Sequence, residues 1–227
     1  MIMKRKNLFL TAALMMGLVM ATSCESNDNP VSDSGNEDSN GTEFAMKVEC
    51  QKNLGEWTNA EIEMTFQVAS EDPAEASLKD CEPLTAEPVK VVIPGIAELI
   101  VVREGQEGDL VDYAVTSIRK FTFWNCTSLE AVTIPATVRS IGDHAFDNCT
   151  SLVSITFEEG SQLETIEMAA FSYCEALTEI DIPASVKTIS EKAFSHCDNL
   201  KKVTLHGSPV IQEGAFPEGT EVSYVTE

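Results

Sequence analysis

The chain has 227 residues, of which 43% are hydrophobic, and its 37 acidic side chains outnumber 15 basic ones for a formal net charge of −22. A charge of this size and sign opposes binding to nucleic-acid backbones and to bare anionic membrane surfaces. We therefore exclude both as direct partners.

Residues 1–23 have the pattern of a lipoprotein signal peptide. A basic stretch at 4–6 precedes an apolar run at 8–21, which is shorter than the ~20 residues of a membrane-spanning helix. Small residues then precede Cys24, as at a cleavage site. This resembles a bacterial lipobox, although Ala21 stands where a leucine is usual, and it implies that Cys24 is lipidated. The alternative is an ordinary signal peptide followed by an unmodified Cys24.

Residues 24–42 form a polar tract of mainly Ser, Asn, Asp, Glu and Gly with no basic residue. Such a composition cannot bury enough apolar surface to fold, so we predict a disordered acidic tether. In Bacteroides-like bacteria, acids after a lipidated cysteine accompany export to the surface, so the resemblance implies an outer-membrane lipoprotein facing outward. A calcium-loop start at 36–41 fails because Lys47 occupies the position of the required glutamate.

Residues 43–110 lack any repeat and are expected to form a β-rich N-terminal cap. Residues 62–68 alternate between apolar and polar, and 89–93 and 99–102 are β-branched runs, as in strands. The acid- and proline-rich segment 71–88 is predicted to be a loop. A cap is needed because the end coil of a solenoid otherwise exposes its core.

Residues 111–227 carry a repeat marked by four cysteines at 126, 149, 174 and 197, which are 23, 25 and 23 residues apart. A fixed period in the low twenties with apolar register positions is typical of a solenoid. A degenerate fifth unit keeps Ile211, Phe216 and Val222 in register, with Gly219 in the cysteine position. The apolar register positions of the four full units are Ile118, Ile141, Ile166, Ile189; Phe123, Phe146, Phe171, Phe194; and Leu129, Leu152, Leu177, Leu200.

The repeat resembles the BspA-like leucine-rich repeat. The matching segments read NCTSLEAVTIP at 125–135, IGDHAFDNC at 141–149 and IPASV at 182–186. The resemblance implies a β-rich right-handed solenoid of four to five coils with one parallel strand per coil, and a surface protein of gut or oral anaerobes. Residues 64–68 are similar to the strand that caps such repeats. The chain departs from the pattern where Phe157-Glu158 and Leu205-His206 replace Ile-Pro, and at Thr122.

The residues that could carry chemistry favour structural roles. Equivalent cysteines of stacked coils point the same way, so we expect a buried ladder of free thiols rather than disulfides or a metal site. Cys50 and Cys81 could form a disulfide in an exported protein, and this is left open. His144, His196 and His206 occupy unrelated register positions and are expected to be solvated. We therefore expect no catalytic residues, no metal, no cofactor and no enzyme activity.

The candidate binding residues lie on the outward positions of the predicted repeat strands. Alternation along Leu-x-x-Ile-x-Ile sends two residues per strand outward. These residues are Ala131, Thr133, Ser154, Thr156, Glu179, Asp181, Lys202 and Thr204. Trp124 and Tyr173 stand at non-register turn positions and are candidates for glycan contact, although Trp124 is expected to pack under the cap.

These features predict a cell-surface lipoprotein that binds another macromolecule, most simply a protein, through the strand face. One alternative is an accessory glycan-binding lipoprotein of a polysaccharide-uptake system. Another is a structural spacer with no specific ligand. Exposed aromatic rings near Trp124 or Tyr173 would favour a glycan, and a polar face without rings would favour a protein.

Overall fold

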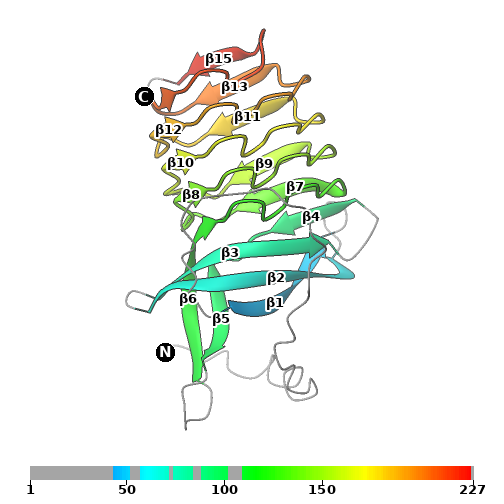
Figure 1. The fold of residues 1–227 in the computed structure, drawn as a ribbon, viewed down its shortest axis with the longest axis vertical. Coiled ribbons are helices and arrows are strands. Elements are labelled where there is room, and N and C mark those ends of the chain that lie inside the picture. The colour runs from blue at the N-terminus through cyan, green and yellow to red at the C-terminus, as the bar shows by residue number, and fades with distance from the viewer. Residues whose placement is uncertain (1–42, 52–56, 72–73, 84–87, 102–108, 226–227) are drawn as a thin grey trace, which may run out of the picture. The chain divides into compact units, whose positions relative to one another are not determined.

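The computed structural model describes residues 43–51, 57–71, 74–83, 88–101 and 109–225, and these residues contain strands and turns but no helix (Figure 1). The predicted signal peptide, Cys24 and the acidic tether lie outside the described residues. No described segment is therefore a helix that could cross a membrane.

The described residues form fifteen strands. Those before the repeats are β1 (Glu43–Gln51), β2 (Trp57–Glu71), β3 (Ala74–Pro83), β4 (Val89–Val92), β5 (Ile96–Val101) and β6 (Asp109–Ile118). Those of the repeats are β7 (Leu129–Ile134), β8 (Ser140–Ile141), β9 (Ser154–Phe157), β10 (Thr165–Ile166), β11 (Glu179–Ile182), β12 (Thr188–Ile189), β13 (Lys202–Leu205), β14 (Val210–Ile211) and β15 (Glu221–Tyr224).

The N-terminal region is an antiparallel meander in which β2 pairs with β1 on one side and β3 on the other. The prediction of a loop at 71–88 was wrong, because β3 fills most of it. The acidic residues and prolines of this segment disfavour a strand, but β3 pairs on one edge with β2, antiparallel, and on the other with β6, parallel. Leu78 of β3 is fully buried. Because β2 lies between the strands that carry Cys50 and Cys81, the strand order does not bring these residues together; their side chains lie outside the described part.

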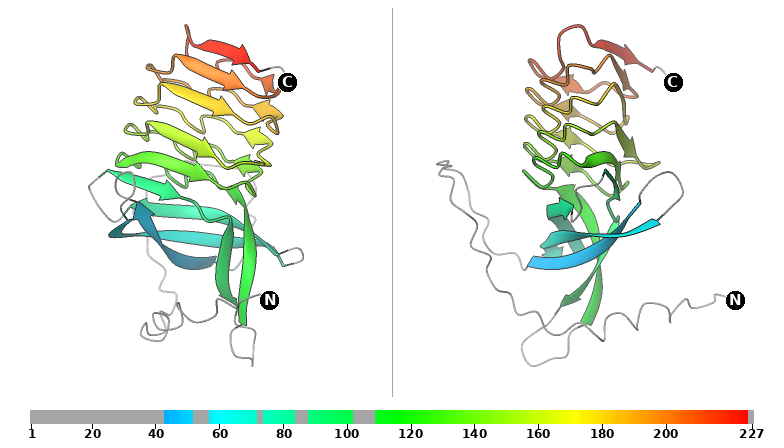
Figure 2. Two further views of the ribbon diagram at one scale, coloured as in Figure 1. Left: turned by 180° about the vertical axis from the view of Figure 1, so that it is seen from behind. Right: turned by 90° about the vertical axis from the view of Figure 1, so that its right-hand side faces the viewer.

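The repeats stack as two parallel ladders, seen from two further directions in Figure 2. We call β4, β7, β9, β11, β13 and β15 the long-strand ladder. The short-strand ladder consists of the end of β6 followed by β8, β10, β12 and β14. The expected parallel β-solenoid is confirmed, but each coil carries a second, two-residue strand in addition to the one strand predicted.

The meander connects the two ladders at their N-terminal end. β1 pairs with β4 at Gln51 and Lys90, and β3 pairs with β6, so each ladder is met by one edge of the same sheet. β4 itself pairs in parallel with β7. The long-strand ladder therefore starts at Val89, inside the region 43–110 that the sequence assigned to the cap, and the β5–β6 hairpin is an excursion within this first coil.

The core between the ladders is built from identical positions of successive coils. Phe123, Phe146, Phe171, Phe194 and Phe216 stack with ring centroids 4.7, 5.0, 5.1 and 5.3 Å apart. Such contacts bury large apolar area at each coil and tie it to the next.

The cysteines confirm the predicted thiol ladder. Cys126, Cys149, Cys174 and Cys197 are buried, and none of them forms a disulfide. The thiols of the last three donate to the carbonyl oxygens of Phe123, Phe146 and Phe171, at 3.1, 3.3 and 3.0 Å. Each bond reaches back to the preceding coil, so the ladder fixes the stacking of the coils.

Candidate functional site: a break in the long-strand ladder

The predicted outward residues do lie on one surface, which we call the strand face: Ala131, Thr133, Ser154, Thr156, Glu179, Asp181, Lys202 and Thr204. None of them is buried. They form two columns by register, with Ala131 beside Ser154 and Glu179 beside Lys202 in the first. Binding through this face remains a prediction.

The strand face is interrupted in its middle. β7 pairs with β9, and β11 pairs with β13 and β13 with β15, but no backbone pairing joins β9 to β11, although both strands are described. The short-strand ladder continues past this point, since β10 pairs with both β8 and β12. The coils therefore stay stacked at the core and separate only at their long strands.

The hydrogen bonds of the neighbouring pairs show which backbone groups face the break. The Lys202 N–H donates to the Thr178 oxygen at 3.3 Å, and the His206 N–H donates to the Ile182 oxygen at 3.0 Å. Even-numbered residues of β13 thus direct their amides at β11, and because the pleat alternates, odd-numbered residues direct theirs away.

The same alternation applies to the two strands at the break. Glu179 and Asp181 are the register partners of even-numbered β13 residues, so their amides are directed at β9. In β9, the N–H of Glu158 donates to the preceding coil, which leaves the amides of Ile155 and Phe157 directed at β11. These four amides have no strand partner across the break.

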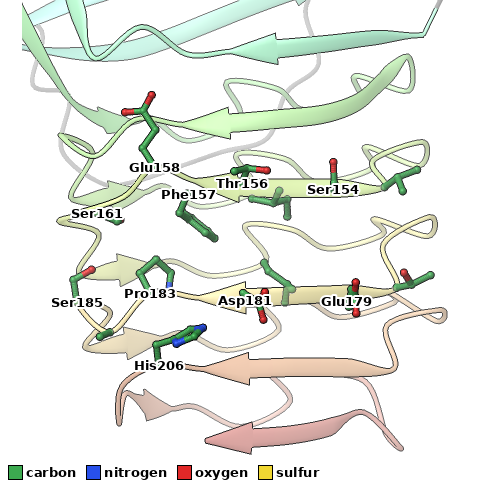
Figure 3. A pocket seen from close by; sticks show the side chains of 16 residues that line it. Ser154, Thr156, Phe157, Glu158, Ser161, Glu179, Asp181, Pro183, Ser185 and His206 are labelled. Atoms are coloured by element: carbon green, nitrogen blue, oxygen red, sulfur yellow. The ribbon is translucent and has the colours of Figure 1, made fainter. Parts of the chain in front are cut away.

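The break forms a cleft with a volume of about 670 Å³ (Figure 3), within the range of small-ligand sites. Its apolar lining residues include Ile155, Phe157 and Pro183, and its polar lining comes from strand-face residues of both strands and from the turns that follow them. Figure 3 shows the Phe157 ring directed into the space between β9 and β11. The principal polar lining residues are Ser154, Thr156, Glu158, Ser161, Glu179, Asp181, Ser185 and His206.

The cleft is acidic. Its lining residues include Glu158, Glu179 and Asp181 but neither lysine nor arginine, and Figure 3 shows the Glu158 side chain directed away from β11, toward the preceding coil. Glu158 accepts a hydrogen bond from the Ala136 N–H at 3.1 Å, while Glu179 and Asp181 are exposed. The arrangement therefore favours a cationic or hydrogen-bond-donating ligand.

The expectation that Trp124 packs under the cap was wrong, because its side chain is 56% exposed. Tyr173 is 43% exposed. Trp124 lies edge-on to Phe121 at 6.5 Å between ring centroids, and Tyr173 stacks on His196 at 4.3 Å. Both rings stand on the turns between the ladders, so the turns carry exposed rings that the strand-face columns lack.

Two positions in the turn of each coil have a left-handed backbone, and Phe121 and Tyr173 occupy such positions. Phe121 and Tyr173 have φ values of 62° and 55°, and the equivalent positions of other coils share this conformation. Bulky residues adopt it at a cost of about 1–3 kcal/mol. The turn hydrogen bonds hold the conformation, and the rings at these positions are kept outward.

The three histidines do not converge. His144 contacts Asp147 at 2.9 Å, His196 stacks on Tyr173, and only His206 lines the cleft. The described residues contain no group of three or more side chains suited to a metal ion. Among the thiols, burial raises the pKa of Cys149, and the Cys197 side-chain hydrogen bond followed by burial raises that of Cys174. These thiols therefore stay protonated and lack nucleophilic character.

Sequence reasoning found the strand face but missed the cleft. Two signals were present, the 25-residue cysteine spacing and the replacement of Ile-Pro by Phe157-Glu158. Neither disturbs the core, where the short strands on both sides of this point stay paired. Neither indicated that the strand pairing would be lost on one side alone.

Comparison with known proteins gives the same repeat. Residues 116–226 match the BspA type leucine rich repeat region in six copies. A leucine-rich repeat protein from Bacteroides capillosus is 32% identical over 63% of this chain and 94% of its own, with a TM-score of 0.49. The chain belongs to the BspA-type leucine-rich repeat family.

Two other solved structures share the fold over part of their length. A leucine-rich repeat protein from Bacteroides ovatus is 27% identical with a TM-score of 0.56, over 76% of this chain and 41% of that one. The pneumococcal vaccine antigen PcpA is 23% identical with a TM-score of 0.53, over 79% of this chain and 46% of that one. No curated protein matches the chain. Membership of this family supports an interaction or adhesion-type module.

Proposed function

We propose that this BspA-type protein is a cell-surface lipoprotein that binds another protein through its strand face, centred on the cleft between β9 and β11. The observation that carries this proposal is the interruption of the long-strand ladder, which exposes backbone amides and core side chains in an otherwise regular face. Ile155 and Phe157 are partly exposed there. Concave sites with an apolar base and a few polar groups are the usual form of binding sites.

The cellular location is part of the proposal and rests on the sequence before the described residues. The pattern at 1–23, Cys24 and the acidic tract at 24–42 would place the solenoid outside the outer membrane on a lipid anchor. Surface proteolysis of intact Bacteroides-type cells tests this. Cleavage of the wild type together with protection of Cys24→Ala supports it, and protection of the wild type contradicts it.

Site-specific photo-crosslinking tests the binding face. A photoreactive residue replaces Thr156 at the cleft, and a matched variant carries it at Glu191, an exposed turn residue. A discrete protein adduct from position 156 but not from position 191 supports binding through the strand face. Equal adducts, or adducts from 191 alone, contradict it.

A second candidate is glycan binding at the turns, favoured by the exposed rings of Trp124 and Tyr173. Sugars pack on exposed aromatic faces, and Asn125 and Asn148, linked by a 2.6 Å hydrogen bond, supply amide groups at neighbouring turn positions. A glycan array probed with the wild type and with Trp124→Ala separates the candidates. Glycan binding by the wild type that is lost in Trp124→Ala would favour the glycan. If neither protein binds any glycan, the protein partner is favoured. A spacer with no specific ligand would bind in neither test.

A further inference from the structure

The residues around the break define what kind of protein segment fits it. The facing edges of β9 and β11 each offer amides without a strand partner, so an extended segment can hydrogen-bond to them as in strand addition. The two strands are each four residues long, which corresponds to ~13 Å of extended chain. Some Cα atoms of β9 and β11 lie within 8 Å of each other, whereas the two neighbours of an inserted strand lie ~9.6 Å apart. The long strands therefore have to move apart to admit the backbone of an extended segment, and a helix, which is wider, does not fit.

The cleft also offers an apolar contact that regular coils do not have. The equivalents of Ile155 and Phe157 in the next coil are Ile180, 4% exposed, and Ile182, fully buried. At the break, Ile155 and Phe157 are only partly covered. One apolar side chain of a bound segment would cover them.

A further polar atom in the cleft wall lacks a partner. The Ser185 hydroxyl oxygen is buried and makes no hydrogen bond, and Ser185 lines the cleft. A buried polar group without a partner is costly. A bound backbone or side-chain group could satisfy it.

Charge selects among possible segments. Glu158, Glu179 and Asp181 line the cleft, with no lysine or arginine in its lining. The chain's own tract at 24–42 carries acids and no base, so it would be repelled. Complementarity requires lysine or arginine in the bound segment.

We infer that the cleft between β9 and β11 binds an extended, lysine- or arginine-bearing segment of the partner protein, with one apolar side chain placed on Ile155 and Phe157. This inference rests on the proposed protein-binding function and names the chemistry of its partner. The basic side chains face Glu179 and Asp181 of β11. The segment's backbone meets the free amides of the two strands.

The test is an NMR titration of the purified, amide-labelled protein with the capped peptide KTKVKTK, and with ETEVETE and QTQVQTQ as matched peptides. The inference predicts that KTKVKTK shifts the amides of 154–157 and 179–182, and that the acidic peptide does not bind. Glu179→Gln with Asp181→Asn should weaken binding about five- to tenfold, since two charge contacts are lost. Glu213→Gln with Glu218→Gln removes the same charge from exposed positions outside the cleft. This control should change the affinity for KTKVKTK less than twofold.

Four other outcomes overturn the inference. If KTKVKTK does not bind, the cleft is not a peptide-binding site. If QTQVQTQ binds equally well, basic side chains are not required. If both double variants weaken binding equally, the peptide responds only to the overall negative charge of the protein. Shifts confined to the turns place binding elsewhere. If KTKVKTK binds at the cleft but no adduct forms at position 156, the protein-binding function fails while the peptide specificity stands. An adduct at position 156 without peptide binding supports the protein-binding function and overturns the inferred peptide chemistry.

Discussion

Phe157 and Ile182 occupy the same repeat position in consecutive coils, yet Ile182 is fully buried and Phe157 remains partly exposed at the edge of the cleft. The difference arises on one side of the solenoid only. On the other side, Ile166 and Ile189 pair in register and are both fully buried. The coil with two extra residues between β9 and β10 thus loses long-strand pairing on one side while its short strand stays paired.

Close backbone contact between coils makes Gly142 sensitive to substitution. A Cβ at this position would lie 2.7 Å from the Lys120 nitrogen and 2.8 Å from the Arg119 carbonyl carbon. Because both contacts are backbone, the coils must shift, and we expect Gly142→Ala to lower the free energy of unfolding by about 1–3 kcal/mol. Gly95→Ala is the control, since its nearest contact is 3.4 Å. Urea denaturation measures both, and equal stability of the two variants would contradict the close stacking.

Adjacent aromatic residues in the first turn should respond oppositely to truncation. Phe123 is 1% exposed and begins the phenylalanine stack, whereas Trp124 is 56% exposed. Phe123→Ala should cost about 3–5 kcal/mol, and Trp124→Ala should stay within about 0.5 kcal/mol of the wild type. Thermal and denaturant unfolding check this. A large loss in Trp124→Ala would mean that the ring packs under the cap after all.

The thiol ladder should make the protein less stable in alkali. Burial raises the pKa of Cys149 above its ordinary value of 9.0, so the folded state keeps a proton that the unfolded state loses. Stability is therefore full below about pH 9 and falls as pH rises beyond it, by up to ~1.4 kcal/mol per pH unit for each thiol.

Denaturation at several pH values measures the alkaline slope. Cys149→Ala should reduce it, although the variant also loses packing and is less stable at neutral pH. Comparison of slopes rather than of absolute stabilities separates the two effects. An unchanged slope in Cys149→Ala would show that this thiol does not titrate on unfolding.

The repeat chemistry made the core predictable. An apolar residue at a fixed period must face the next coil, so Phe146 and Cys149 could be assigned to a stack and a thiol ladder from spacing alone. The strand-face columns followed from alternation in the same way. These features depend on sequence positions that recur in every coil.

The rest depends on pairing that no recurring position encodes. β3 is a strand because β2 and β6 hold its two edges, and its composition does not reveal those partners. The break at Phe157 is a loss of pairing between β9 and β11 alone, which the repeat pattern does not encode.

Amide hydrogen exchange tests the break most directly, because it compares equivalent residues of one molecule. The amides of Ile155 and Phe157 face the break, and those of their equivalents Ile180 and Ile182 face β13. We predict exchange at least tenfold faster at Ile155 and Phe157, and likewise faster at Glu179 and Asp181 than at Lys202 and Thr204. Equal protection across each set would mean that β9 and β11 are paired in solution, and the cleft proposed as the binding site would not exist.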